Sequence, residues 1–287
     1  MASSNFRISR LFLYFILVSL FLFVAGNVGR YLIETQNVDR KVAMPLQGGI
    51  FTGLTLIVIY ILKKKSPELI RSIGLKGVIS LPRMVVGIAL PFILLGVGIL
   101  TAYLFGGIEN LRMNLTTNVV ISVLINTITA FMYEAFPEEV FIRGLIFEEL
   151  QKKFRFFVSL LLQPLIFICV PITVMSMESI FFDKPFAITI DYFILLFAFG
   201  IALQLYRTYT GSLWMNIIFH IVYLEVVRYI SLGGAYESGV ALLDFDETFE
   251  GFMSLYLSFL FIVIFSIVVL SFFILNDRRK MRFNRSL

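Results

Sequence analysis

The stretch Glu134-Ala-Phe-Pro-Glu138-Glu139-Val-Phe-Ile-Arg143-Gly144 decides how the whole chain is interpreted. It places three carboxylates and a guanidinium inside a run of otherwise apolar residues. Ionisable groups at membrane depth are costly, so they mark a functional site by default. In a helix, Glu139 and Arg143 lie four residues apart on one face, in the order that stabilises the helix. Glu138 is then the carboxylate without an obvious neighbouring cation.

Pro137 stands directly before the two adjacent acids. A helix that starts or restarts at this proline would carry Glu138 and Glu139 in its first turn, where free N–H groups and the dipole favour negative charge. Glu134 lies one turn earlier, and we expect protonation or cavity water to accommodate it.

The composition is that of a polytopic membrane protein. The 287 residues are 59% hydrophobic and only 15% charged, whereas soluble domains are about 25% charged. Cys169 is the single cysteine and His220 the single histidine. An intrachain disulfide framework is therefore excluded, a zinc site would need carboxylates for most of its ligands, and no convincing metal site or other cofactor is apparent.

Apolar runs predict an all-α bundle of about eight transmembrane helices, since each run is near the ~20 residues that span a bilayer. The first run could pass for a signal peptide, but we interpret it as a retained span. The second contains Gly48, Gly49 and Gly53, which leaves a re-entrant form open. The runs lie at about 11–25, 46–62, 84–105, 118–147, 157–179, 186–206, 212–230 and 252–275.

Charges in the loops predict the orientation. Every second loop is basic, beginning with Arg7 and Arg10 and ending with the tail 277–285, while the loop at 237–250 is acidic. The positive-inside rule therefore places both termini in the cytoplasm. We expect a multi-pass protein of a bacterial cytoplasmic membrane, with the lipid bilayer and no nucleic acid as partner. Residues 66–83 form either a short interfacial helix or an ordinary connecting loop.

The predicted spans bring polar groups to one level. Glu138 and Glu139 lie about ten residues from the basic end of the fourth span, and His220 lies about eight residues from the same end of the seventh. At ~1.5 Å per residue, these positions are roughly 12–16 Å deep. We expect the acids and His220 to face each other, level with Phe167–Pro171, in a layer that opens toward the cytoplasm.

Two motifs carry a family resemblance. Glu138-Glu139-x-x-x-Arg143-Gly144 resembles the first motif of the CAAX-processing and bacteriocin-processing (CPBP, or Abi) intramembrane proteases. Thr210-Gly211-Ser212-Leu213-Trp214, followed by His220, looks like a later motif of that family, in which a tight turn leads into a helix with a histidine. The similarity covers roughly residues 118–230.

Two positions depart from the family pattern. The second motif, Phe-x-x-x-His, is matched by Phe167-Ile-Cys-Val-Pro171, with proline in the place of histidine. The last motif, His-x-x-x-Asn/Asp, is matched by His220-Ile-Val-Tyr-Leu224, with leucine in the place of the amide. Nearby polar substitutes are Cys169, Thr173 and Asn216.

The resemblance implies a role for each retained residue. Glu138 would be the general base, Glu139 would support it while paired to Arg143, and His220 would be an oxyanion donor. The alternatives are a structural ion pair for Glu139–Arg143 and a neutral His220 that is hydrogen-bonded to one of the acids. Outside the motif, Glu225 is expected to pair with Arg228.

Three parts are therefore expected, and three functions are compared. Residues 1–117 are N-terminal spans with an amphipathic connector, 118–230 the family-like core, and 231–287 an acidic outer loop, the last span and a basic tail. We expect a catalytically impaired homologue that acts as a scaffold or regulator of a membrane or cell-envelope protein. The alternative is an active glutamate-dependent endopeptidase that processes membrane-bound or leader peptides. A small transporter with buried carboxylates ranks last.

Overall fold

The computed structural model describes residues 6–75, 80–186, 188–231, 242–249 and 260–286. Helices dominate this part of the chain, and the only two strands in it are short. The first half contains α1 (Ile8–Glu34), α2 (Arg40–Lys65), α3 (Pro67–Ser72), α4 (Leu81–Leu104), β1 (Ile108–Met113), α5 (Thr117–Ala130), the π-helix η1 (Phe131–Ala135), α6 (Phe136–Glu138), the π-helix η2 (Glu139–Ile146) and α7 (Phe147–Gln151). The second half contains α8 (Phe156–Phe182), α9 (Ile190–Thr210), α10 (Leu213–Glu225), the π-helix η3 (Val226–Ser231), β2 (Leu243–Glu247) and α11 (Phe265–Ser286).

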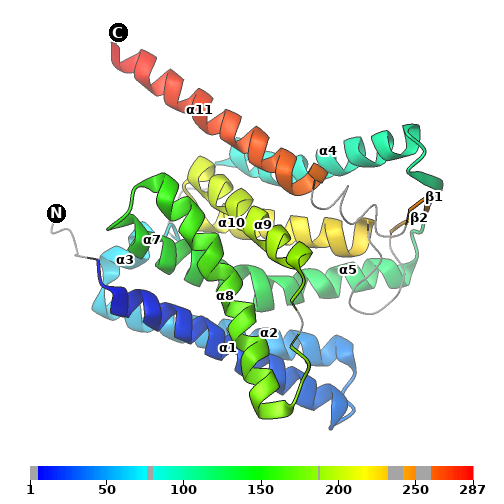
Figure 1. The fold of residues 1–287 in the computed structure, drawn as a ribbon, viewed down its shortest axis with the longest axis horizontal. Helices are drawn as coiled ribbons and strands as arrows, with labels where there is room; N and C mark the ends of the chain where they lie inside the picture. Colours follow the sequence, from blue (N-terminus) through cyan, green and yellow to red (C-terminus); the bar gives the residue numbers. More distant parts are fainter. Residues whose placement is uncertain (1–5, 76–79, 187, 232–241, 250–259, 287) are drawn as a thin grey trace.

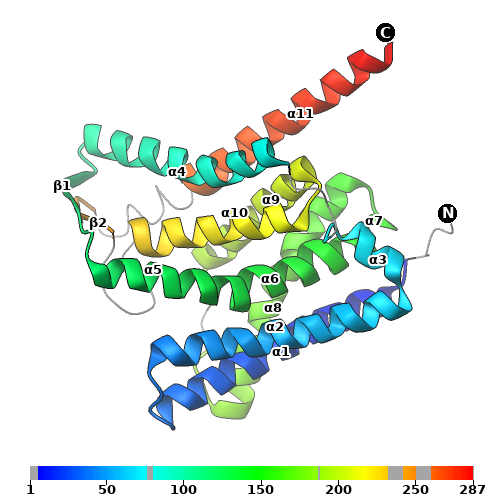
Figure 2. The same cartoon turned by 180° about the vertical axis from the view of Figure 1, so that it is seen from behind.

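The helices form layers around a central group. The α1–α2 pair lies along one side of the bundle, α4 and α11 lie along the opposite side, and α5, α9 and α10 fill the space between them (Figures 1 and 2). Helix α8 crosses this arrangement at a steep angle and packs against both α1 and α9. The prediction of a polytopic helical bundle is confirmed.

Seven helices in the described residues are long and apolar enough to cross a membrane. Large apolar side chains remain exposed along them, as lipid contact requires. The seventh expected span, 212–230, forms α10 and continues into η3. It is not among the seven, but it packs in the centre of the bundle against α4 and α9. The beginning of the last expected span, residues 252–259, lies outside the described residues.

The fourth span is one long helical segment, Thr117–Gln151. The expected start or restart at Pro137 is wrong, because Ala135, Phe136 and Glu138 all have right-handed helical backbone angles. The segment instead widens into π-helix on both sides of the proline, as η1 and η2. π-Turns inside helices occur frequently at functional sites. The acids therefore lie in mid-helix, and side-chain partners must stabilise their charge.

Helix α2 is continuous over 26 residues, so the possible re-entrant form of the second span is wrong. Gly48 has a packing role, because a Cβ atom there would lie 2.9 Å from the Cβ of Met132 and 3.3 Å from the backbone nitrogen of Tyr133. Thr52 completes the contact by donating to the Met132 carbonyl at 2.6 Å. Helix α2 thus lies directly against the π-helix that carries Glu134.

The turn between α9 and α10 is built as its sequence predicts. Gly211 ends α9 with a left-handed φ of 70°, a conformation that glycine adopts without steric cost. The connector after α2 covers this turn, since Leu213 N–H donates to Gly74 O at 3.3 Å and Trp214 Nε1 donates to Leu75 O at 3.0 Å. Residues 66–83 were expected to form either a short interfacial helix or a connecting loop. A short helix of six residues, α3, is present, and it buries Ile70 in the bundle.

The opposite end of the bundle carries the two strands. β1 and β2 pair antiparallel, with Ile108 opposite Glu247 and Arg112 opposite Asp244. They join the loop after α4 to the acidic loop before the last span. The start of α1 and the end of α11 lie at the other end, together with α3 and α7 (Figures 1 and 2). The start of α1 and the end of α11 therefore lie on one side of the bundle, in agreement with the alternation of loop charges.

Candidate functional site

Glu139 lies at the centre of the candidate site. Its carboxylate is fully buried and interacts with three side chains. His220 Nδ1 lies 2.9 Å from Oε1, Arg143 Nη1 lies 3.1 Å from Oε1, and the Asn216 amide donates to Oε2. The predicted Glu139–Arg143 pair therefore exists, and the other two partners of the carboxylate come from α10. His220 was expected to contact either Glu138 or Glu139, and the acid that it contacts is Glu139.

Arg143 has two further neighbours. Phe167, from α8, lies under its guanidinium with 4.4 Å between Cζ and the ring centroid, which is a cation–π contact. The backbone carbonyl of Arg143 accepts a hydrogen bond from Arg207, whose other nitrogen pairs with Glu148 at 3.0 Å. Arg143 thus connects the first motif, the phenylalanine of the second motif and the end of α9.

Glu138 faces a cavity instead of a cation. The cavity has a volume of about 420 Å³, and both Glu138 and His220 line it. Within the described residues, Glu138 has neither a hydrogen-bond nor an ion-pair partner. His220 is 2% exposed and contacts Phe199 edge-to-face at 5.1 Å. The prediction that Glu138 and His220 share one level is confirmed, and Glu138 is the acid available to a bound molecule.

The expected opening toward the basic end of the bundle is wrong. On α8 the cavity is lined by positions 167–178 of a helix that ends at Phe182. On α9 it is lined by positions 192–199 of a helix that begins at Ile190. The cavity therefore occupies the half of the bundle next to the α8–α9 connection, away from the start of α1.

A second cavity continues in the same direction. It measures about 540 Å³, reaches Glu34 and Arg40 at the α1–α2 connection, and shares Leu22, Tyr133, Val174 and Glu178 with the first. Glu178 pairs with Arg30 at 2.9 Å where the two cavities meet. The shared walls indicate a route from the end opposite the basic loops to Glu138.

The two positions that depart from the family pattern line the same cavity as Glu138. Pro171 and Leu224 are both part of its wall. The helix register therefore places them where the resemblance requires a histidine and an amide. Their apolar side chains add no polar group beside Glu138 and His220, and the same wall also contains Glu134, Tyr223 and Arg228.

The expected polar substitutes do not compensate. Cys169 is exposed on α8 and does not line the cavity. The hydroxyl of Thr173 is also exposed and donates to the Cys169 carbonyl at 2.8 Å. Asn216 is the exception, because it binds Glu139. The spacing of four residues between Asn216 and His220 was the signal that placed both on one face of α10.

The expected partners of Glu134 and Glu225 are wrong. Arg228 is directed at Glu134 and binds both of its oxygens, at 2.6 and 2.7 Å. Glu225 accepts hydrogen bonds from Asn126 at 2.8 Å and Thr127 at 3.0 Å. The ion pair between η3 and η1 therefore prevails over sequence proximity. The sequence signal for the Glu134–Arg228 pair was two opposite charges, each placed among apolar residues in a different span.

Within the described ranges, no group of three or more histidine, cysteine, aspartate and glutamate side chains is placed to hold a metal ion. The four residues that the motifs single out are otherwise together. Glu139, Arg143 and His220 form one contact network, and Glu138 adjoins it on the cavity side.

Comparison with known families agrees with this geometry. The family model described as type II CAAX prenyl endopeptidase Rce1-like matches residues 117–224. The match begins at α5 and ends at Leu224 in α10, so it contains every residue of the Glu139 network. No curated protein and no solved structure matches the chain. Residues 117–224 are therefore similar to the Rce1-like type II CAAX prenyl endopeptidases, which is consistent with the CPBP resemblance of the motifs in this segment.

Proposed function

We propose that this protein binds a segment of a membrane or cell-envelope protein in the Glu138 cavity without hydrolysing it. It would act as a scaffold or regulator that keeps the protease fold. The observation that carries the proposal is the wall of the cavity, where Pro171 and Leu224 stand next to Glu138 and His220. The resemblance implies that hydrolysis at this site depends on polar groups at both of these positions.

The state of His220 is a second argument. Because Glu139 is an acceptor held by Arg143 and Asn216, it favours the tautomer in which His220 Nδ1–H donates to it. In this tautomer Nε2 is an acceptor, and His220 lines the cavity. The arrangement of His220 therefore supports a site that can bind a hydrogen-bond donor of a ligand.

The lining of the cavity suggests the chemistry of the ligand. Val174, Leu195 and Val227 give it apolar walls, while Glu138 offers a hydrogen-bond acceptor at its inner end. An apolar segment with a donor or cationic group at its tip is complementary to such a cavity. The route past Arg30 and Glu178 suggests that the segment enters from the side opposite the basic loops. With both termini in the cytoplasm of a bacterial cell, as the loop charges predict, this side faces the cell envelope.

Binding is tested by filling the cavity with a larger side chain. Val174→Trp places a large side chain in the cavity, whereas Val158→Trp changes the same helix where it is 41% exposed and lines no part of the cavity. We expect a membrane protein that co-purifies with the wild-type chain to be lost from Val174→Trp and retained by Val158→Trp. The partner is identified by mass spectrometry and confirmed by reciprocal purification. Equal recovery with both variants would contradict binding in the cavity.

The second candidate is an active glutamate-dependent endopeptidase for membrane-bound or leader peptides. The observation that favours it is Glu138, which faces the cavity beside His220 and has no described partner. A positioned general base contributes ~10²–10⁴-fold. Processing of a membrane-bound peptide in cells, followed in the wild type, Glu138→Ala and His220→Ala, separates the candidates. Loss of processing in both variants would establish the protease and reject the non-catalytic role.

A further inference from the structure

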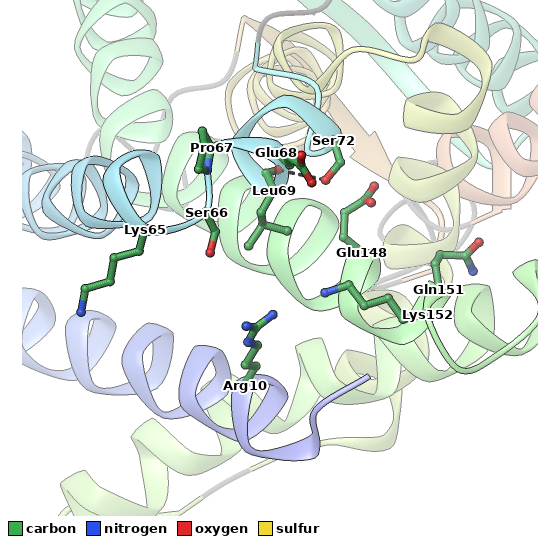
Figure 3. Close-up of a pocket in the computed structure, with 10 residues that line it drawn as sticks. All are labelled: Arg10, Lys65, Ser66, Pro67, Glu68, Leu69, Ser72, Glu148, Gln151 and Lys152. Carbon is green, nitrogen blue, oxygen red and sulfur yellow. Dashed lines mark hydrogen bonds between the residues drawn. The ribbon is translucent and has the colours of Figure 1, made fainter. Parts of the chain in front are cut away.

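A second pocket lies at the basic end of the bundle, remote from Glu138. Its volume is about 560 Å³, and none of its lining residues lines the Glu138 cavity. Figure 3 shows three cationic side chains, Arg10, Lys65 and Lys152, around its open space. They come from the start of α1, the end of α2 and the residue after α7, so folding, and not one basic run, brings them together.

Two of the three cations are available to a ligand. Arg10 and Lys65 have no hydrogen-bond or ion-pair partner among the described residues. Lys152 is paired with Glu149 at 2.5 Å. The neighbouring lysine at position 64 behaves differently, because its ammonium lies over the Tyr60 ring at 4.5 Å and outside the pocket. Of the three lysines at the end of α2, only Lys65 lines the pocket.

A buried carboxylate fixes the shape of the pocket. Glu149 is fully buried, accepts the backbone N–H of Arg7 at 2.8 Å, and pairs with Lys152. It therefore holds the start of α1 against α7. The acids on the opposite wall are Glu68 and Glu148, and Arg207 pairs with Glu148 at 3.0 Å. The unpaired positive charge consequently lies on the side of α1 and α2.

We propose that this pocket binds the phosphate group of a phospholipid headgroup. A phosphate offers several acceptor oxygens to Arg10 and Lys65 together, and charge-assisted bonds of this kind are the strong ones. The pocket lies at the ends of the spans, which is the level of the headgroups. Basic pockets at this level on the cytoplasmic side of membrane proteins are suited to anionic lipids. The bound lipid would tie α1, α2 and α7 together.

The experiment measures retained lipid on the full-length protein in detergent. Phosphatidylglycerol is titrated into delipidated protein and its binding is followed by native mass spectrometry. The test variant is Arg10→Gln/Lys65→Gln, and the control is Lys63→Gln/Lys64→Gln. The control also removes two positive charges, both from the end of α2, and neither of its residues lines the pocket. We expect affinity for phosphatidylglycerol to fall about tenfold more in the test variant than in the control.

Two further arms make the result decisive. Glycerol 3-phosphate competes with the lipid if the site takes soluble phosphates equally well, and such competition would overturn the assignment to a lipid. An equal loss of affinity in both double variants would overturn the pocket itself. The unfolding temperature of each variant without lipid is measured as a folding control. If the test variant does not fold, Lys65→Gln is compared with Lys64→Gln in the same titration.

Discussion

At the scale of single residues, two adjacent glutamates have different surroundings. Glu139 is enclosed by Arg143, His220 and Asn216, whereas Glu138 faces the cavity. A fully buried ion pair is a costly arrangement, and removing one member leaves the other uncompensated. Glu139 therefore organises the site, and Glu138 faces the space that a ligand would occupy.

This difference predicts different effects on stability. Glu139→Gln leaves the fully buried Arg143 without its counter-ion, so we expect the free energy of unfolding to fall by about 3–5 kcal/mol. Glu138→Gln makes the same chemical change one residue earlier and should cost less than about 1 kcal/mol. Denaturant unfolding in detergent measures both. Equal losses would contradict the assignment of the structural role to Glu139.

The sequence predicted part of this arrangement. The spacing of Glu139 and Arg143 predicted their ion pair, and the level of His220 predicted that it faces the two acids, but not which of them it contacts. The partner of Glu134 could not be predicted, because Arg228 is 94 residues away in the sequence and no local spacing encodes that contact. The side to which the cavity opens was also wrongly predicted. The side depends on which halves of α8 and α9 line the cavity, and the positions at which the spans begin and end do not determine this.

At the scale of elements, the π-helices of the fourth span are held by neighbours on two sides. Helix α2 approaches η1 at Gly48, and η3 binds it through Arg228. These contacts fix the helix segment in which Glu138 and Glu139 lie. Two predictions follow at this scale, one for each neighbour.

The approach of α2 is tested with two glycines of the same helix. Gly48→Ala would place its Cβ 2.9 Å from Met132, so we expect a loss of about 1–3 kcal/mol in unfolding free energy. Gly53 has no atom within 4 Å of the corresponding position. Gly53→Ala should therefore stabilise α2 by about 0.5–1 kcal/mol, as alanine does in a helix interior. Opposite signs are the expected result, and two losses of similar size would reject the close packing.

The approach of η3 is tested with a double-mutant cycle on Glu134→Gln and Arg228→Gln. The side chains are 17% and 16% exposed, and the pair is bidentate, so we expect a coupling energy of about 1–3 kcal/mol. The control cycle uses Arg83 and Asp277, whose pair is 39% and 38% exposed and should give about 0–1 kcal/mol. A coupling energy near zero for the first pair would show that it does not hold η3.

At the scale of the whole molecule, the bundle has two different ends. One end carries the start of α1, the end of α11, and the cationic pocket around Arg10 and Lys65. The other carries the β1–β2 pair and the route to Glu138 through the α1–α2 connection. The alternation of basic loops predicts that the first end is cytoplasmic. A partner that reaches Glu138 would then approach from outside the cytoplasm.

Thiol labelling in intact cells tests this orientation. In a Cys169→Ser background, Leu111→Cys introduces a thiol on β1, where the native side chain is 42% exposed. Lys64→Cys introduces one at the other end of the bundle, next to the cationic pocket. A membrane-impermeant reagent should label position 111 in intact cells and position 64 only after permeabilisation. The reverse pattern would invert the orientation and place the route to Glu138 on the cytoplasmic side.

We propose that the cavity keeps its glutamate but lacks the groups that hydrolysis needs. The most direct measurement is cleavage of a prenylated CAAX-type peptide by the purified wild type, Glu138→Ala, and Pro171→His/Leu224→Asn. We predict equal background rates for the first two. The double variant should gain at least about tenfold, part of the ~10²–10⁴-fold of a general base, and lose this gain when Glu138→Ala is added. Cleavage by the wild type that disappears in Glu138→Ala would contradict the account.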